Sequence, residues 1–337
     1  MVCHASSHIE IAIRRFKEAT RVHGGVFPLQ NMEISHKTHE KQLCSAELVE
    51  GLHKLLICLI VVNIFSSITA FLGNTLILVA LRKESSLHPP SKLLFRNLAI
   101  TDLCVGIIVE PLAVTYLMSL VNESLNVCHY SLSALTVTSR IVCAVSLLKV
   151  TTISIDRLLA LFLGLRYRQV VTLKRTYVTV IVFWIVCIVG STMYFWNFVS
   201  MLWCDKIFVP LCLVTSIYCY TKTFLGLCHH QNQVQGNAQE QQRQTIPMNI
   251  ARYKKVVSSA LWLQLTLVVC YLPYIILLAY ITARNNLSSS LFIALEFSLA
   301  LVYLNSSLNP VLYCWKIGEV RQAVKDTIKA LFHCSSI

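Results

Sequence analysis

Seven long apolar stretches separated by short polar connections dominate the middle of this 337-residue chain. They lie near residues 54–81, 92–119, 130–162, 176–200, 203–228, 255–282 and 290–315. Each stretch is long enough for a helix to cross the roughly 30 Å of hydrocarbon in a bilayer, where only helices and closed barrels satisfy their own backbone. The sequence therefore predicts an all-α membrane protein built as a seven-transmembrane helix bundle.

The low content of charged side chains supports the same fold class. Charged residues make up 13% of the chain and the mean hydropathy is +0.63, whereas about a quarter of the residues in soluble domains are charged. This composition excludes an ordinary soluble enzyme. The net charge of +13 does not indicate a nucleic-acid partner, because the basic residues lie between apolar stretches and cannot line a common groove. We expect a lipid bilayer instead.

Two polar regions flank the predicted bundle, which we place at residues 54–315. Residues 1–53 lack the apolar core of a signal peptide, and we expect them to form a disordered extracellular arm. Both Met1 and Met32 remain open as start sites. Residues 316–337 begin with apolar side chains at helical spacing opposite Arg321, Lys325 and Lys329, a pattern typical of a short amphipathic helix on the membrane surface. The remainder is a short tail.

The distribution of Lys and Arg predicts the orientation. If the N-terminus is outside, the predicted inner segments hold most of the basic residues between the spans, and the outer loops hold only Lys206 and Arg284. Cytoplasmic loops carry such an excess, so we expect a cytoplasmic C-terminus. The sequons that begin at Asn122 and Asn286 fall in predicted outer loops and are candidate glycosylation sites.

Asp102 lies in the middle of the second stretch, where an ionisable side chain costs a few kcal/mol unless it is paired or hydrated. One interpretation is a satisfied polar residue in helix packing. The other joins Asp102 to Asn74, Ser146 and Asn309, whose oxygens and amides are suited to holding a sodium ion and waters. Asp102 is the only metal site that we consider.

Asp156 and Arg157 end the third stretch at the predicted inner boundary. They form either an interfacial ion pair with a snorkelling arginine or a contact that helix movement exposes to a cytoplasmic partner. Pro210, Pro273 and Pro310 each remove one backbone hydrogen bond within a predicted helix and are candidate hinges. Periodicity alone does not separate these alternatives.

Short motifs occur once in each apolar stretch. In chain order they are Gly73-Asn74, Leu98-Ala99-Ile100-Thr101-Asp102, Asp156-Arg157-Leu158, Trp184, Pro210 with Tyr218, Cys270-Tyr271-Leu272-Pro273 and Asn309-Pro310-Val311-Leu312-Tyr313. In this order the motifs resemble those of the rhodopsin-like G-protein-coupled receptors, over roughly residues 54–333. They do not separate the subfamilies.

The resemblance implies a multi-pass plasma-membrane receptor, not an enzyme, that binds an extracellular ligand and activates a heterotrimeric G protein, with arrestin as a further partner. It implies that Arg157, Tyr218 and Tyr313 meet in the active state. The sodium and water network around Asp102 would favour the inactive state, and no other cofactor is implied. Lys254 and Lys255 would lie near the G protein, and Cys334 is a palmitoylation candidate.

Two departures from the family pattern affect these expectations. Tyr271 stands where the family usually has a tryptophan beneath the ligand. The usual helix 3 cysteine would fall at Leu132, whereas the nearest cysteine is Cys128. For the family's disulfide to the second outer loop, the resemblance leaves Cys204 as the candidate partner of Cys128.

The ligand class stays open. Amine receptors of the family use an aspartate where this chain has Ser139 followed by Arg140, so a monoamine bound in that way is not expected. Glu110 and Glu296 are candidates for recognising a cation, and Arg140 for pairing with either or with an anionic ligand; alternatively these charges only pair with one another. The short second outer loop and aromatic outer helix ends resemble the melanocortin, adenosine and lipid receptors. The alternative function, a transporter or channel, lacks the internal repeat typical of transporters.

Overall fold

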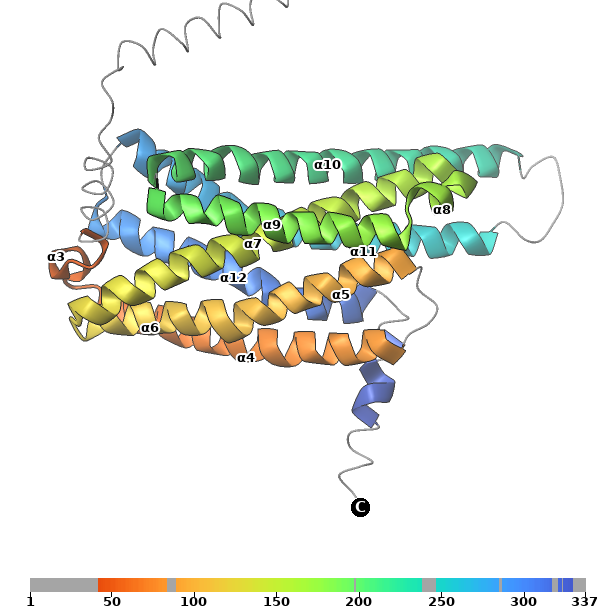
Figure 1. The fold of residues 1–337 in the computed structure, drawn as a ribbon. Helices are drawn as coiled ribbons and strands as arrows, with labels where there is room; N and C mark the ends of the chain where they lie inside the picture. Colours follow the sequence, from red (N-terminus) through yellow and green to blue (C-terminus); the bar gives the residue numbers. More distant parts are fainter. Residues whose placement is uncertain are drawn as a thin grey trace, which may run out of the picture.

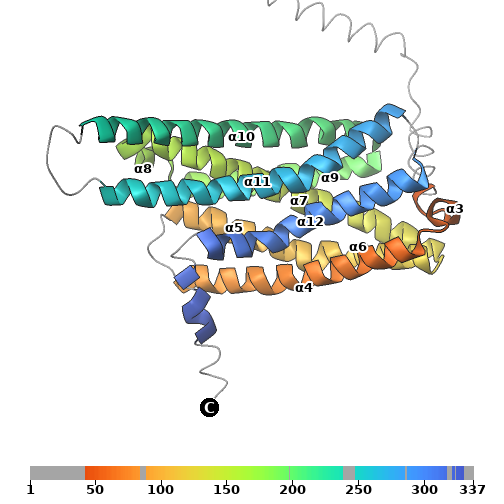
Figure 2. The same ribbon diagram turned by 180° about the vertical axis from the view of Figure 1, so that it is seen from behind.

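The computed structural model describes residues 42–83, 89–196, 198–237, 247–284, 287–316, 321–322 and 324–329. Figures 1 and 2 show that this part of the chain is a bundle of long helices lying side by side. Seven of the described helices are long and apolar enough to cross a membrane, which confirms the predicted fold class. They are His53–Arg82, Pro89–Val121, Leu125–Leu163, Leu173–Thr192, Cys204–Gly226, Gln264–Arg284 and Ser289–Leu312.

The elements follow one another in a simple order along the chain. They are α3 (Ala46–Val49), α4 (His53–Lys83), α5 (Pro89–Cys104), η1 (Val105–Val109), α6 (Glu110–Val121), α7 (Leu125–Leu163), η2 (Gly164–Arg166), α8 (Tyr167–Val170), α9 (Leu173–Trp196), α10 (Phe198–Asn237), α11 (Pro247–Arg284) and α12 (Ser289–Lys316). The second span combines α5, η1 and α6.

The exposed surface of the bundle is rich in large apolar side chains. Phe65 on α4, Val189 on α9 and Leu211 on α10 are each more than 60% exposed. Polar side chains occupy the interior instead: Asn74, Asp102 and Lys149 are fully buried. This arrangement is unfavourable in water, where the exposed apolar side chains would be hydrated. It is favourable in a bilayer, because lipid solvates the apolar surface and the polar side chains find hydrogen-bond partners only inside the bundle.

Helix α7 is the central element of the bundle. It packs against α5 and α6 on one side and against α9 and α10 on another, and also touches α11. Helix α12 packs between α11 and α4, which closes the ring. The α4–α12 contact is close at Gly73, where an added Cβ would lie only 2.9 Å from Pro310 Cγ. Side chains on α7 therefore reach most of the other spans.

The second span contains a π-helical segment, η1, which the sequence reading did not anticipate. Its cause is Pro111, which lacks the N–H of a regular ladder, so the backbone N–H of Glu110 bonds to Val105 O five residues earlier. The widened turn brings Gly106 against α4, where an added Cβ would meet Ser67 O and Phe71 N at 3.1 Å. Ser67 Oγ donates a hydrogen bond of 2.7 Å to Gly106 O.

The two ends of the bundle are named here by the elements they carry. The α3 end holds α3 and the α6–α7 connection, and the α8 end holds η2 and α8 (Figure 1). Part of the arm predicted to be disordered is ordered, because Leu48 and Val49 of α3 are buried against the bundle. Residues 1–41 lie outside the described part.

Two further segments differ from or extend the expectations. Helix α10 continues to Asn237, beyond the predicted stretch of residues 203–228 and into a glutamine-rich segment, because glutamine is a good helix former. Residues 324–329 are helical, with Val324 and Thr327 buried and Lys325 and Lys329 exposed. This is the burial pattern of an amphipathic helix.

Candidate functional site

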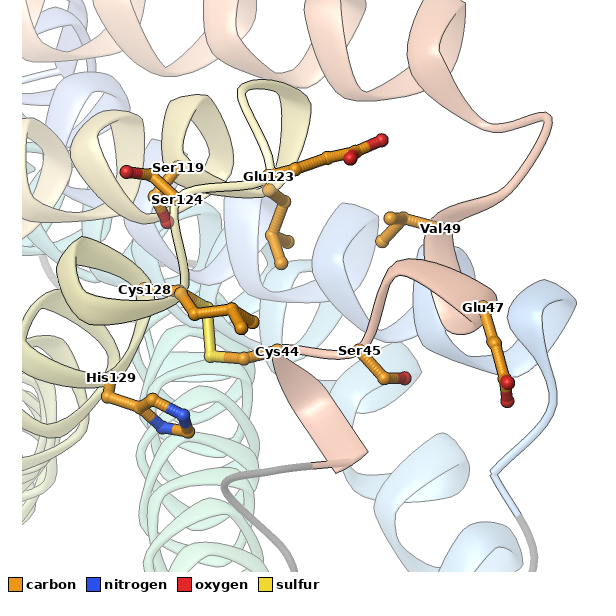
Figure 3. A pocket seen from close by; sticks show the side chains of 11 residues that line it. Cys44, Ser45, Glu47, Val49, Ser119, Glu123, Ser124, Cys128 and His129 are labelled. Atoms are coloured by element: carbon orange, nitrogen blue, oxygen red, sulfur yellow. A yellow bond between two sulfur atoms is a disulfide. The ribbon is translucent and has the colours of Figure 1, made fainter.

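A disulfide at the α3 end joins the segment before the first span to the start of α7. Cys44 pairs with Cys128, 84 residues further along the chain, and Figure 3 shows the bond. The expected Cys128–Cys204 pairing is therefore wrong, and Cys204 is a free, exposed cysteine. The reason is the ordered turn around α3, which lays Cys44 over α7 while the Tyr116 hydroxyl donates to Leu43 O.

This disulfide closes one side of a groove of about 640 Å³. Figure 3 shows the groove between the α3 segment and the ends of α6 and α7, with Glu47, Glu123 and His129 at its edges. Val49, Leu120 and Leu125 supply apolar walls. The α3 segment thus acts as a fixed cover on this side of the α3 end.

A second, smaller cavity of about 80 Å³ lies deeper, between α7, α10, α11 and α12. Aromatic rings line much of it: Phe208, Tyr271, Tyr274 and Tyr303. Three of the predicted ligand-site residues line it: Ser139, Arg140 and Tyr271. The Ser139 hydroxyl donates to Thr136 O at 3.3 Å within its own helix.

An ion pair crosses this cavity from α7 to α10. Arg140 donates to Asp205, and their side chains are only 16% and 20% exposed. Arg140 Nε is buried and has no hydrogen-bond partner in the part of the chain that the structure describes. The expected pairing of Arg140 with Glu110 or Glu296 is not the one that forms, because Asp205 faces Arg140 directly across the α7–α10 contact.

Glu110 and Glu296 lie apart from that pair. Glu110 is fully buried at the junction of η1 and α6, and neither of its carboxylate oxygens has a hydrogen-bond partner among the described residues. Glu296 is partly buried on α12. The structure therefore brings only Ser139, Arg140 and Tyr271 of the predicted ligand residues to one cavity.

Asp102 lies at the centre of the bundle and is fully buried. Asn309 Nδ2 donates to Asp102 Oδ2 at 2.8 Å, and Ser146 Oγ donates to Asp102 Oδ1 at 3.4 Å. Asn74 lies nearby on α4, but its Nδ2 donates to Ala70 O and to Ser306 O. Three of the four residues predicted for the polar network are thus in direct contact, and Asn74 ties α4 to α12 beside them.

At the α8 end, Asp156 collects three donors. Tyr167 OH donates to Asp156 Oδ1 at 2.6 Å, Ser91 Oγ lies 3.3 Å from Oδ2, and Arg157 forms an ion pair of 3.4 Å with Oδ2. Burial, together with the hydrogen bond to Asp156, raises the pKa of the Tyr167 phenol well above its usual range. The aspartate is thereby held between α5, α7 and α8.

The other predicted switch residues are spread over α10, α11 and α12. Tyr218 is 58% exposed on α10, with Lys222 Nζ 5.8 Å from its ring centroid. Pro210, Pro273 and Pro310 each lie inside a continuous helix. Asn122 is exposed at the end of α6. Several residues lie outside the described part: Asn286 and Cys334, and the side chains of Lys254, Lys255 and Tyr313.

Four contacting residues were missed by sequence reasoning. Asp205 begins a span and resembles a loop residue, and Tyr167 follows the third span in an ordinary basic connection. Cys44 could have been considered as a disulfide partner, because it is a cysteine close to the start of the first span. Lys149 was the easiest of the four to identify from the sequence, because it is an ionisable residue in the middle of an apolar stretch, as Asp102 is.

A comparison with protein families agrees with this arrangement. The family model described as "7 transmembrane receptor (rhodopsin family)" matches residues 73–201 and 193–313, which is more than half of the chain. The matched region contains the seven-span bundle from the middle of α4 to the end of the last span. It also contains the polar contacts around Asp102 and Asp156. The chain therefore belongs to the rhodopsin family of seven-transmembrane receptors.

Proposed function

We propose that this receptor sits in the plasma membrane with its α3 end outside, binds an extracellular ligand between its helices and activates a heterotrimeric G protein at its α8 end. The observation that carries the proposal is the position of Arg157. It lies at the end of the third span, 18% exposed, and is bound to the buried Asp156 of its own helix. A shift of neighbouring helices would change the partners of Arg157 without separating it from α7.

The charge distribution supports this orientation. The connection after α7 and the first turn of α9 carry Arg166, Arg168, Lys174 and Arg175, as expected of a cytoplasmic loop. The α3 end carries the Cys44–Cys128 disulfide, and structural disulfides form in oxidising compartments and on cell surfaces. Asn122, at the same end, is then on the side where glycosylation occurs.

The ligand site proposed is the cavity crossed by Arg140 and Asp205. A ligand with one charge would pair with one member and leave the other buried without a partner, which is costly. We therefore favour ligands that are uncharged there, or that carry both an acidic and a basic group, over a simple monoamine. Tyr271 at the cavity floor lies two residues before Pro273, so ligand contact would act next to a candidate hinge of α11.

In the active state, we propose that the ends of α10, α11 and α12 rearrange around Arg157, with Tyr218 and Tyr313 turning towards it. Lys254 and Lys255 of α11 would then contact the G protein, and arrestin would use the same face. Pro210, Pro273 and Pro310 would permit this movement because each removes one bond from the helical ladder.

The test is signalling in cells that express the full chain with an N-terminal epitope tag. Basal and ligand-stimulated responses are recorded with promiscuous and class-specific G-protein sensors, for the wild type and for Arg157→Ala at equal surface expression. We expect a response that Arg157→Ala removes. Arg175→Ala, which changes an exposed arginine at the same end, serves as the matched control and should signal normally. A response that survives Arg157→Ala would contradict the proposed role of Arg157. Silence of the surface-expressed wild type across the panel would count against G-protein activation.

A further inference from the structure

Lys149 is a fully buried lysine in the middle of α7. Among the residues that the structure describes, no carboxylate lies within ion-pair distance of its Nζ atom. A charged amine at this depth in a membrane bundle is expensive unless other groups compensate it, and such residues usually have a specific role. The contacts of Lys149 indicate what that role is.

Two groups on two other helices hold the ammonium. Lys149 Nζ donates a hydrogen bond of 2.8 Å to Asn97 O on α5, and it lies 5.2 Å from the ring centroid of Trp184 on α9. A backbone carbonyl is a pure acceptor, and an indole face attracts cations. Both contacts therefore suit a positive charge and fix its position between three helices.

Lys149 and Asp102 are connected through the contact between α5 and α7. Thr101, which precedes Asp102, donates its hydroxyl to the same Asn97 O that Lys149 uses. Ser146, one helical turn before Lys149 on α7, donates to the Asp102 carboxylate. The opposite charges of Lys149 and Asp102 attract each other in the buried interior. The effect of such charges extends over several ångströms where the dielectric constant is low.

With Lys149 in place, the residues around Asp102 do not fit the sodium ion that the family resemblance implies. Both carboxylate oxygens already accept hydrogen bonds, from the Asn309 amide and the Ser146 hydroxyl. Asn74 Oδ1 is buried without a partner among the described residues, and oxygens that accept one hydrogen bond can still face a hard cation. What excludes a sodium ion is the positive charge of the Lys149 ammonium, which would repel it.

We propose that Lys149 is the built-in counter-ion of Asp102, so that the bundle takes up no sodium ion at this site. A sodium ion would bring a positive charge to Asp102 from solution. Here the Lys149 side chain of α7 supplies that charge. It neutralises Asp102 while leaving the Asn309 and Ser146 hydrogen bonds in place. The inference concerns ion binding alone and does not rest on ligand recognition or G-protein activation.

The experiment compares melting temperatures of the purified full-length protein in sodium chloride and in choline chloride at equal ionic strength. Neither a ligand nor a G protein is needed, so the result is independent of the signalling test. We expect the wild type to melt at the same temperature in both salts. In Lys149→Met, which keeps an unbranched side chain of similar length and removes the charge, sodium should bind. A sodium concentration roughly ten times the dissociation constant should then raise the melting temperature by about 2 °C.

Three further variants assign the effect. Lys149→Met/Asp102→Asn should lose the sodium response, because the anionic ligand is gone. Lys149→Arg keeps a charge and should show none. Lys222→Met removes a lysine that lies over the exposed Tyr218 ring and should behave as the wild type. If Lys149→Met folds and melts alike in both salts, the inference is wrong. It is also overturned if the wild type shows a sodium-specific rise that Asp102→Asn removes, a comparison that does not require the lysine variant to fold.

Discussion

Helix α7 carries two arginines that each pair with an aspartate, but the two pairs are built differently. Arg140 lies in the half of α7 towards the α3 end, and Arg157 lies near the α8 end. At the α3 end, Arg140 pairs with Asp205, which comes from another helix 65 residues further along the chain. At the α8 end, Arg157 pairs with its own neighbour Asp156, and Tyr167, eleven residues away, adds the shortest hydrogen bond there. The Cys44–Cys128 disulfide reinforces the contrast, because it links residues 84 positions apart at the α3 end.

The difference separates stability from switching. Links between distant segments hold helices together, so breaking one at the α3 end should loosen the bundle. The contacts of Asp156 lie mostly within α7 and the connection that follows it, so the α8 end can change its arrangement while α7 keeps its place in the bundle. Ser91 on α5 adds a longer contact of 3.3 Å to Asp156. The α3 end is therefore the fixed end, and the α8 end is the one suited to movement.

The largest effect should come from removing the disulfide. Cys44→Ser frees the α3 segment from α7, and the loss of a crosslink of this kind typically costs about 2–4 kcal/mol. For a chain of this size that corresponds to a melting temperature lower by roughly 3–6 °C. Thermal unfolding of the purified protein, followed by circular dichroism, measures it.

Cys204→Ser is the matched control for this prediction. Cys204 is exposed and unpaired, so its replacement should leave the melting temperature unchanged. The opposite result, a stable Cys44→Ser and an unstable Cys204→Ser, would favour the Cys128–Cys204 disulfide that the family resemblance suggested. The Cys44–Cys128 disulfide would then no longer distinguish the α3 end from the α8 end.

The seven spans were predictable from the sequence because few backbone structures are stable within a bilayer. Every backbone group must be satisfied within the span, so twenty or more apolar residues in a row indicate a helix whatever its neighbours are. The contact of Asp102 with Ser146 and Asn309 was predictable for a related reason, since polar groups at that depth must find one another. The family resemblance supplied the choice of partners.

The links at the α3 end were not predictable in the same way. Sequence alone does not determine which cysteines pair, and the pairing of Cys44 depends on a short turn whose position comes from packing. Asp205 lies at the edge of a span, where an acidic residue indicates a loop as readily as a buried pair. Asp102 was singled out because an ionisable side chain in the middle of an apolar stretch needs a reason. Lys149 meets the same criterion on α7, so the same argument would have identified this buried lysine.

A smaller loss of stability should follow from breaking the Arg140–Asp205 pair. Asp205→Asn leaves the Arg140 charge largely buried without an anion. The side chains are partly solvated, at 16% and 20% exposure, so the cost should be about 1–3 kcal/mol, below that of a fully buried pair. Thermal unfolding again measures it.

The exchanged pair Arg140→Asp/Asp205→Arg tests whether the link itself matters. If the α7–α10 ion pair stabilises the bundle, the exchange should recover much of the loss, because both charges again have a partner. Asp326→Asn, at an exposed position in the last helical segment, should have no effect. Equal melting temperatures for Asp205→Asn and the wild type would show that the pair is not part of the fixed end.

The smallest structural change should have its main effect on signalling. Tyr167→Phe removes the 2.6 Å hydrogen bond to Asp156 and leaves the aromatic ring in place. The raised pKa of Tyr167 keeps the phenol protonated across the physiological range, so this bond is present at every pH at which cells are assayed. Losing about 1 kcal/mol from an arrangement that restrains Arg157 should shift the equilibrium and raise basal G-protein activity roughly fivefold at equal surface expression, with little change in melting temperature. Tyr177→Phe, at an exposed position on α9, should leave basal activity unaltered. A large drop in melting temperature without a rise in basal activity would instead show that the Tyr167 hydrogen bond stabilises the bundle. The contacts at both ends of α7 would then serve stability, and the contrast between the two ends would be lost.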